Sequence, residues 1–234
     1  MKDKSIVWNP FRMISPKLDE EIGKIEDLHR AEISQTLTPE ESIMIMLAKL
    51  IQVTRILSTS SRAESLEKLV ECEDLIRQVH MLEKNTTANI LGQSSAVGKN
   101  SFRVFVRFPS RIERIGIMFE NILNAIHTKI NDGIPFSDKA QDEMHAVLDL
   151  LADLLVNLRD CLVVTNHVLL RHIEGECQQL DQLVENARLA HWERLEAGYC
   201  SPKANSIFLC ILDSVKTITQ YVKNMKDNLL EFAH

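Results

Sequence analysis

The amino-acid sequence predicts an all-α protein built from two tandem three-helix bundles, which follow an N-terminal arm and a short helix. The composition is the first observation, because 234 residues contain only seven Gly and six Pro, and aromatic residues make up 5%. Such a chain favours long helices with short connections. The second observation is that apolar residues recur at steps of three and four over long segments, as in amphipathic helices. The third is an internal repeat that relates the two halves of the chain.

The N-terminal segment, residues 1–37, lies outside this repeat. Residues 1–15 contain aromatic side chains and a proline without a steady period, which favours an extended arm that packs on the body or on a partner. A short helix is expected over about 16–35. Pro16 suits its first turn, and the acidic residues that follow suit the positive end of the helix dipole.

Six further helices are predicted. The first has a strong start signal, because Thr38 can cap it, Pro39 suits its first position and Glu41 follows three residues after the cap. The connection over residues 92–101 contains two glycines, Gly92 and Gly98, but it has neither the spacing nor the preceding strand of a phosphate-binding P-loop. The predicted helices span about 38–57, 62–92, 102–131, 138–164, 166–196 and 203–232.

The internal repeat has a constant offset. Asn121 and Asn224 differ by 224 − 121 = 103 residues, and the same offset pairs Phe105 with Phe208. Further apolar and acidic pairs follow it across three helices without a gap, which is hard to obtain by chance. The predicted domains are the arm and short helix (1–37), the first three-helix repeat (38–132) and the second three-helix repeat (133–234).

The helix expected over 102–131 carries the most distinctive stretch of the chain. Its apolar stripe is interrupted by Glu113, Arg114 and Gly116, a polar set that packing alone does not demand. The stretch resembles the PhoU family, whose helices carry a run close to Leu-Glu-Arg-Ile-Gly-Asp-x-x-x-Asn-Ile. Residues 112–116 and 121–122 match this run. The resemblance covers nearly everything after residue 38 and implies a PhoU-like fold of two three-helix repeats in a divergent member.

The resemblance also implies a metal site on the third helix of each repeat, where an acid and an Asp four residues later share one helix face. Glu113 keeps the first ligand position, but Ile117 replaces the Asp. In the second repeat, Lys216 and Gln220 stand at the corresponding positions, and a lysine ammonium repels a cation. We therefore expect the multinuclear metal cluster of the family to be lost. A divalent metal or iron bound through Glu113 is the alternative.

Glu113 also has structural interpretations. Ser110 and Glu113 have the spacing of a capping box, in which Glu113 would bind the backbone of a helix that restarts after Pro109. If the helix instead continues without interruption, Glu113 is expected to pair with a neighbouring arginine. The structural interpretations together are favoured over the metal ligand.

Four arginines lie on one narrow stripe of the same helix, at spacings of four, four and three residues: Arg103, Arg107, Arg111 and Arg114. Because guanidinium groups repel one another, acidic groups should face them. We favour pairing with acids of adjacent helices, such as Glu71, Glu73 or Asp74. The functional alternative is a docking or anion-binding strip, since arginine forks match phosphate and carboxylate groups.

Other polar groupings carry less information. Asp149 and Asp153 have the spacing of the metal motif but lie on the wrong helix, so a solvated face is favoured. His172 and Glu176 lack the further ligands that zinc needs. A di-iron bundle needs two Glu-x-x-His motifs, and only residues 26–29 have that spacing. No nucleophile–base constellation stands out, so we expect no enzyme.

Charge and cysteine content narrow the class of protein. The net charge of −6 argues against a nucleic-acid binder, which needs a basic face. Five cysteines without a C-x-x-C pair suit reduced thiols in a cytoplasmic protein. No uninterrupted apolar run approaches the roughly 18 residues that span a bilayer, and the N-terminus lacks the apolar core of a signal peptide. A soluble, cytoplasmic protein is expected.

The resemblance implies a regulator of phosphate uptake or signalling that binds a membrane phosphate transporter or a sensor kinase. It would meet the membrane only through that partner. The same domain also occurs, by resemblance, in the cytoplasmic tail of sodium/phosphate cotransporters. Two other classes remain open: a metal-binding helical-bundle protein or enzyme, and a helical scaffold unrelated to phosphate. The long amphipathic helices and the aromatic arm are compatible with a homodimer.

Overall fold

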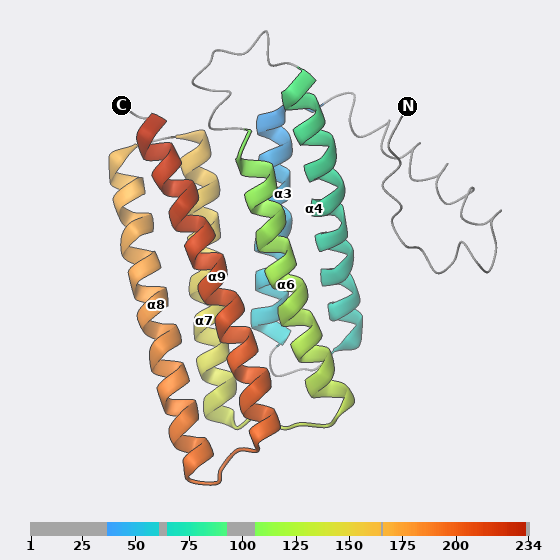
Figure 1. Cartoon of the computed structure of the whole chain (residues 1–234), viewed down its shortest axis with the longest axis vertical. Coiled ribbons are helices and arrows are strands. Elements are labelled where there is room, and N and C mark those ends of the chain that lie inside the picture. The colour runs from blue at the N-terminus through green and yellow to red at the C-terminus, as the bar shows by residue number, and fades with distance from the viewer. Residues whose placement is uncertain (1–36, 61–64, 93–105, 165, 233–234) are drawn as a thin grey trace, which may run out of the picture. The chain divides into compact units, whose positions relative to one another are not determined.

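The computed structural model describes residues 37–60, 65–92, 106–164 and 166–232. In that part of the chain it contains α-helices and no strand, which confirms the all-α class (Figure 1). The predicted arm, the short helix and the glycine-containing connection lie outside the described residues. The helices are α3 (Pro39–Ser60), α4 (Leu66–Gly92), α6 (Phe108–Asn131), α7 (Asp138–Val163), α8 (His167–Glu196) and α9 (Pro202–Phe232).

Local sequence signals explain where the helices of the second half begin and end. The Ser137 hydroxyl accepts a hydrogen bond from a main-chain N–H in the first turn of α7. The Asn166 side chain does the same for α8, at 2.8 Å from the Leu169 nitrogen. Between α8 and α9, Gly198 adopts φ +76°, a conformation that glycine takes without steric cost. The predicted bounds of these helices are therefore confirmed to within a residue or two.

The start of α6 differs from the prediction. The helix begins at Phe108, with Arg107 at the N-cap and Pro109 in the first turn, where a missing N–H costs nothing. No side chain caps it. The predicted capping box of Ser110 and Glu113 is wrong, because Ser110 already lies inside the helix and its hydroxyl donates to the Arg107 carbonyl at 3.2 Å. Pro109 starts this helix and does not kink it.

The helices pack as two sets of three. Helices α3, α4 and α6 contact one another, as do α7, α8 and α9. The two sets meet where α3 packs on α7 and where α6 packs on α9, and the ribbons of each pair run side by side in Figure 1. Residues 39–234 form one compact unit. The division into repeats at residue 132 stays a prediction.

A single apolar core runs through all six helices. The stripe predicted for α6 lies in it, since Ile112, Ile115, Phe119 and Ile122 are fully buried. Phe208 of α9 is fully buried as well. Each large apolar side chain that is buried in this way stabilises the folded state by about 1.5–3 kcal/mol. The core therefore fixes which faces of α6 and α9 remain available for a site.

Helix α3 corrects one expectation. Among the described helices, the segment Pro39–Thr59 is long and apolar enough to cross a membrane, with a mean hydropathy of 1.4. Counting uninterrupted apolar runs missed it because Lys49, Gln52 and Arg55 interrupt the run, whereas the many Ile, Leu and Met residues keep the mean hydropathy high. In the bundle, 56% of its most apolar window is buried. Such burial is typical of a core helix in a helical bundle.

Candidate functional site

Glu113, the predicted metal ligand, faces α4 and contacts a histidine. Its Oε1 lies 3.7 Å from Nδ1 of His80, whose Nε2 lies 3.1 Å from Oε1 of Glu120. Because the two carboxylates contact opposite nitrogens of one ring, they do not converge on a common ion. No group of three or more His, Cys, Asp or Glu side chains in the described part of the chain is arranged to hold a metal. The structure thus gives Glu113 a histidine partner in place of the expected arginine.

The other three positions of the metal motif lie at the surface. Ile117 is 38% exposed on α6. Lys216 and Gln220 are exposed on α9, and the Gln220 amide donates to Oδ1 of Asn224 at 3.4 Å. An exposed ammonium group at the second-repeat position opposes cation binding there. A metal at Glu113 remains a prediction that these contacts do not support.

Gly116 lies on the α4 side of α6, beside His80. A Cβ atom at this position would lie 3.6 Å from Cε1 of His80 and 3.7 Å from Cγ2 of Ile76, which is ordinary van der Waals contact. Gly116→Ala is therefore expected to raise the free energy of unfolding by about 0.5–1 kcal/mol, because alanine loses less backbone entropy in a helix. Urea denaturation with an unchanged m-value measures this gain. A loss of stability would show that α4 and α6 cannot accommodate the methyl group.

The arginine strip on α6 is directed partly to α9. Nη1 of Arg111 donates to the main-chain oxygen of Asn224 at 2.8 Å, so this side chain joins α6 to α9. Burial, and to a lesser degree the charge of Arg107, lower the pKa of the Arg111 guanidinium. Arg107 and Arg114 are exposed, and Arg103 lies outside the described residues.

The acids of α4 have other partners than the predicted arginines. Oε1 of Glu73 lies 2.9 Å from Nε2 of His127, and Asp74 pairs with Arg77 on its own helix. Glu71 accepts a hydrogen bond from Gln52 of α3. None of the three described arginines of the strip pairs with these acids, and the nearby acid that acts on Arg111 is Glu231 of α9. The pairing of Arg103 stays a prediction. The two exposed arginines remain candidates for a docking or anion-binding strip.

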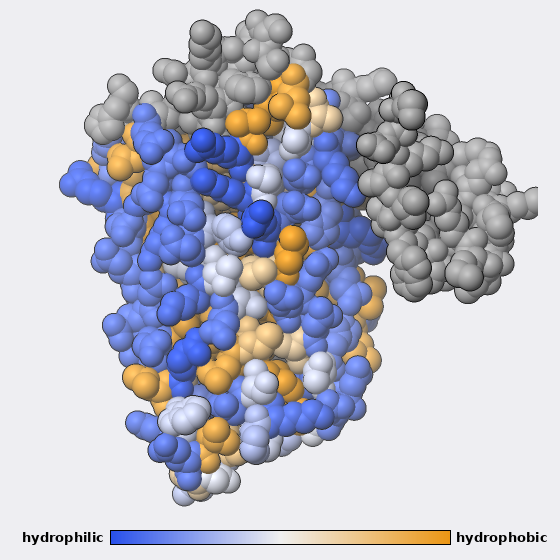
Figure 2. All heavy atoms as spheres, in the orientation of Figure 1, coloured by the Kyte–Doolittle hydropathy of each residue, from blue (hydrophilic) through white to orange (hydrophobic). Residues whose placement is uncertain are grey.

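An open groove of about 580 Å³ lies between α6 and α9. Met118 and Asn121 line it from α6, and α9 contributes mainly small and polar side chains, among them Asn205, Ser206 and Thr217. Figure 2 shows a pale band of mildly polar residues along this face, between strongly hydrophilic flanks. The groove is thus a surface rich in neutral hydrogen-bonding groups.

The polar side chains that meet across the contact between α8 and α9 (the second seam) differ from those that meet between α4 and α6 (the first seam). In the first half, carboxylates meet histidines. In the second half, three residues of α8 at intervals of seven form ion pairs with α9: Glu174 with Lys226, Asp181 with Lys223, and Arg188 with Asp213. The hydrogen bond from Lys226 lowers the pKa of Glu174, and the bond to Asp181 raises the pKa of Lys223. Glu174 and Lys223 therefore stay charged at neutral pH, because the ordinary pKa of Glu lies well below pH 7 and that of Lys lies well above it.

Two other polar pairs from the sequence have structural partners. Asp149 accepts a hydrogen bond from Ser58 of α3 and lies 3.3 Å from Nε2 of His145, so it joins α3 to α7. Glu176 is buried, accepts two hydrogen bonds from the Asn157 amide, and lies 3.4 Å from Nε2 of His172. Asp149 and Glu176 thus hold helices together, whereas Asp153 is exposed.

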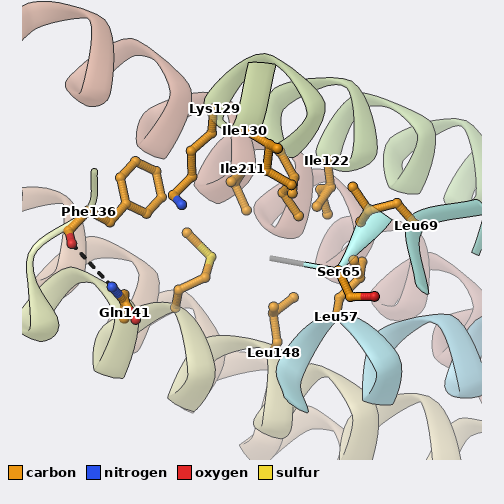
Figure 3. Close-up of a pocket in the computed structure, with 12 residues that line it drawn as sticks. Leu57, Ser65, Leu69, Ile122, Lys129, Ile130, Phe136, Gln141, Leu148 and Ile211 are labelled. Atoms are coloured by element: carbon orange, nitrogen blue, oxygen red, sulfur yellow. Dashed lines mark hydrogen bonds between the residues drawn. The ribbon is translucent and has the colours of Figure 1, made fainter. Parts of the chain in front are cut away.

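A small, partly open pocket beside the core has a volume of only about 40 Å³, room for two or three water molecules. Figure 3 shows its mostly apolar wall, with the Lys129 side chain beside Phe136. Nζ of Lys129 lies 5.2 Å from the centre of the Phe136 ring, a cation–π distance. The Gln141 amide donates to the Phe136 carbonyl at 3.2 Å. These contacts close one end of the pocket, and its size excludes an organic ligand.

A cluster around His191 was missed by sequence reasoning. The imidazole is buried and stacks on Phe208, with ring centres 4.2 Å apart. Nη2 of Arg194 lies 3.1 Å from its Nδ1, and Sγ of Cys200 lies 3.7 Å from its Nε2. Burial, then the charge of Arg194, lower the pKa of His191. The sequence pointed to this contact only through the spacing of His191 and Arg194, which lie three residues apart on one predicted helix.

Arg194 is fixed by an ion pair that joins two helices. Its two terminal nitrogens lie 2.8 and 2.5 Å from the two carboxylate oxygens of Glu143 on α7. The arginine and glutamate side chains are 13% and 24% exposed. This bidentate geometry fixes the plane of the guanidinium group and thereby its hydrogen bond to His191.

Comparison with known proteins finds similar structures but no similar sequence. No protein-family profile matches the sequence, and no curated protein matches it. The phosphate transport system regulatory protein PhoU from Streptococcus pneumoniae is similar in structure, with a TM-score of 0.73 at 13% identity, over 89% of this chain and 96% of that one.

Two structures from Shewanella oneidensis MR-1 are also similar. A putative PhoU-like phosphate regulatory protein has a TM-score of 0.59 at 10% identity, over 85% of this chain and 97% of that one. A PhoU-like protein has a TM-score of 0.60 at 12% identity, over 84% of this chain and 99% of that one. The chain therefore has the PhoU fold.

Proposed function

We propose that this protein is a divergent PhoU-family regulator of phosphate uptake or signalling, which acts in the cytoplasm by binding a membrane phosphate transporter or a sensor kinase. The observation that carries the proposal is the fold likeness to a phosphate transport system regulatory protein over 89% of this chain and 96% of the other. The agreement extends over nearly the whole length of both chains. It joins the motif resemblance of α6, whose polar positions Glu113, Arg114 and Asn121 lie outside the apolar core.

The face formed by α6 and α9 is the surface that we assign to the partner. Its groove offers amide and hydroxyl groups, such as those of Asn121 and Ser206, that can hydrogen-bond to a polar backbone or side chain. Arg107 and Arg114 add exposed guanidinium groups on the same helix, and these suit carboxylate or phosphate groups on a partner. The proposed role needs no bound metal and no reaction at this face.

A pull-down from native membranes tests the proposal. The full chain serves as bait, and captured proteins are identified by mass spectrometry. We expect a phosphate transporter or its sensor kinase to be recovered. Asn121→Arg places a bulky charge in the groove and should reduce that recovery about tenfold or more, because a buried unpaired charge at an interface costs several kcal/mol.

A matched control separates the groove from a general effect of added charge. Gln179→Arg makes the same kind of change at an exposed position of α8, outside the groove lining, and should leave recovery unchanged. Recovery of neither a transporter nor a kinase by the folded chain would favour a helical scaffold unrelated to phosphate. If Asn121→Arg recovered as much partner as the unchanged chain, the partner would not bind in the groove between α6 and α9.

A further inference from the structure

Cys200 lies against a histidine that cannot move away. It is the partly exposed residue just before Ser201, in the connection from α8 to α9, and its Sγ lies 3.7 Å from Nε2 of His191. The His191 side chain is 1% exposed and stacks on the ring of Phe208 at an interplanar angle of 13°. The imidazole therefore presents its Nε2 to the sulfur as a fixed group.

The hydrogen bonds of His191 determine which nitrogen carries the proton. Arginine has only donors, so the contact of 3.1 Å between Arg194 and Nδ1 makes Nδ1 the acceptor. In the neutral ring the proton is then on Nε2, and this N–H points to Cys200. Burial keeps the ring neutral, since it lowers the pKa of His191. The sulfur is thus the acceptor of the pair, which is the role that an anionic sulfur takes.

An ion pair and a helix terminus lie close to this cysteine and its histidine. The guanidinium of Arg194 lies next to His191 and is held there by Glu143. Cys200 also precedes the first turn of α9, where the Ser201 hydroxyl accepts from the Ala204 N–H at 3.1 Å. The N-terminus of a long helix favours negative charge nearby. An N–H donor, whose position Arg194 sets, and a helix terminus therefore both lie beside the same thiol.

The other cysteines lack this combination. Burial raises the pKa of Cys72 and of Cys177 to about 12 and also raises the pKa of Cys161. Cys210 is exposed on α9, at the groove, and none of its described contacts is to a histidine. Cys210 can therefore serve as the internal reference against which the reaction rate of Cys200 is measured.

We propose that Cys200 is a reactive thiol, activated by the N–H of His191, and that it is the first residue of this chain to be oxidised by a hydroperoxide. The sulfur attacks one peroxide oxygen, an S–O bond forms and the O–O bond breaks. The thiol proton passes through solvent to the leaving oxygen, which departs as water or an alcohol. The sulfur loses two electrons and becomes a sulfenic acid, and the peroxide is reduced. His191 acts as a hydrogen-bond donor, and its Nε2 already carries a proton, so it is not the base.

Competitive alkylation of the full chain tests this assignment, independently of the proposed function. Trypsin separates Cys200, in the peptide 195–203, from Cys210, in the peptide 204–216. At pH 7, limiting iodoacetamide should label Cys200 about tenfold faster than Cys210, although Cys210 is the more exposed, because the thiolate is the nucleophile. Hydrogen peroxide followed by a dimedone probe should mark Cys200 first. Equal or faster reaction of Cys210 would overturn the proposal.

Two further measurements separate activation from mere access. His191→Phe keeps a ring on Phe208 but removes the N–H donor, so the Cys200 rate should fall to that of Cys210, whereas His191→Gln keeps a donor and should retain part of the advantage. An unchanged rate in His191→Phe would contradict the role of the donor.

Discussion

Phe208→Ala is expected to lower the free energy of unfolding by about 3–5 kcal/mol, the range for removing a buried aromatic ring. Phe208 is fully buried on α9. It stacks on His191 at 4.2 Å and meets the ring of Phe136 edge-on at 5.6 Å, so both contacts are lost with the side chain. Urea or guanidinium denaturation of the unchanged protein and of the Phe208→Ala variant measures the difference in the free energy of unfolding.

Tyr199→Ala is the matched control, because it removes a comparable ring only nine residues before Phe208, where the side chain is 81% exposed. Its stability should change by no more than about 0.5 kcal/mol. A loss below about 1.5 kcal/mol for Phe208→Ala would show that His191 and Phe136 collapse into the space. Such a collapse would also displace the imidazole from Cys200, which the alkylation assay would detect.

The helices of the second half could be predicted because their signals are local. Ser137 and Asn166 accept first-turn hydrogen bonds, and Gly198 makes a turn with positive φ, so each boundary depends on a few neighbouring residues. The start of α6 could not be placed in this way. Arg107 provides no side-chain cap, and the periodic pattern continues upstream of Pro109, so periodicity alone overestimated the helix.

The candidate site was less predictable because its contacts cross between helices. Spacing within one helix put Glu113 outside the apolar stripe of α6, but it cannot show that His80 of α4 lies opposite. Whether two helices bring such groups together depends on their relative rotation, which the core side chains set. The same limit applies to Arg194, whose partner Glu143 lies on another helix, and to Arg111, which bonds to α9 and not to the acids of α4.

Arg194→Met is expected to lower the free energy of unfolding by about 2–3 kcal/mol, because it leaves the Glu143 carboxylate partly buried without its cation. Fully buried pairs cost about 3–5 kcal/mol when one partner is removed. The 13% and 24% exposure of the two side chains lets water screen part of the remaining charge. Nε of Arg194 is buried without a hydrogen-bond partner among the described residues, and its removal offsets a further part of the loss.

A double-mutant cycle with Glu143→Gln measures the pair itself, and a coupling energy of about 1–2 kcal/mol is expected for side chains in direct contact. Arg188→Met is the control: its ion pair with Asp213 is 28% and 62% exposed, so the loss should stay below about 1 kcal/mol. Equal losses for the two variants would show that the Glu143 pair is screened like a surface pair. Arg194→Met also frees Nδ1 of His191 to carry the proton. The N–H donor to Cys200 is then no longer fixed, so the variant that breaks the ion pair should also slow the alkylation of Cys200.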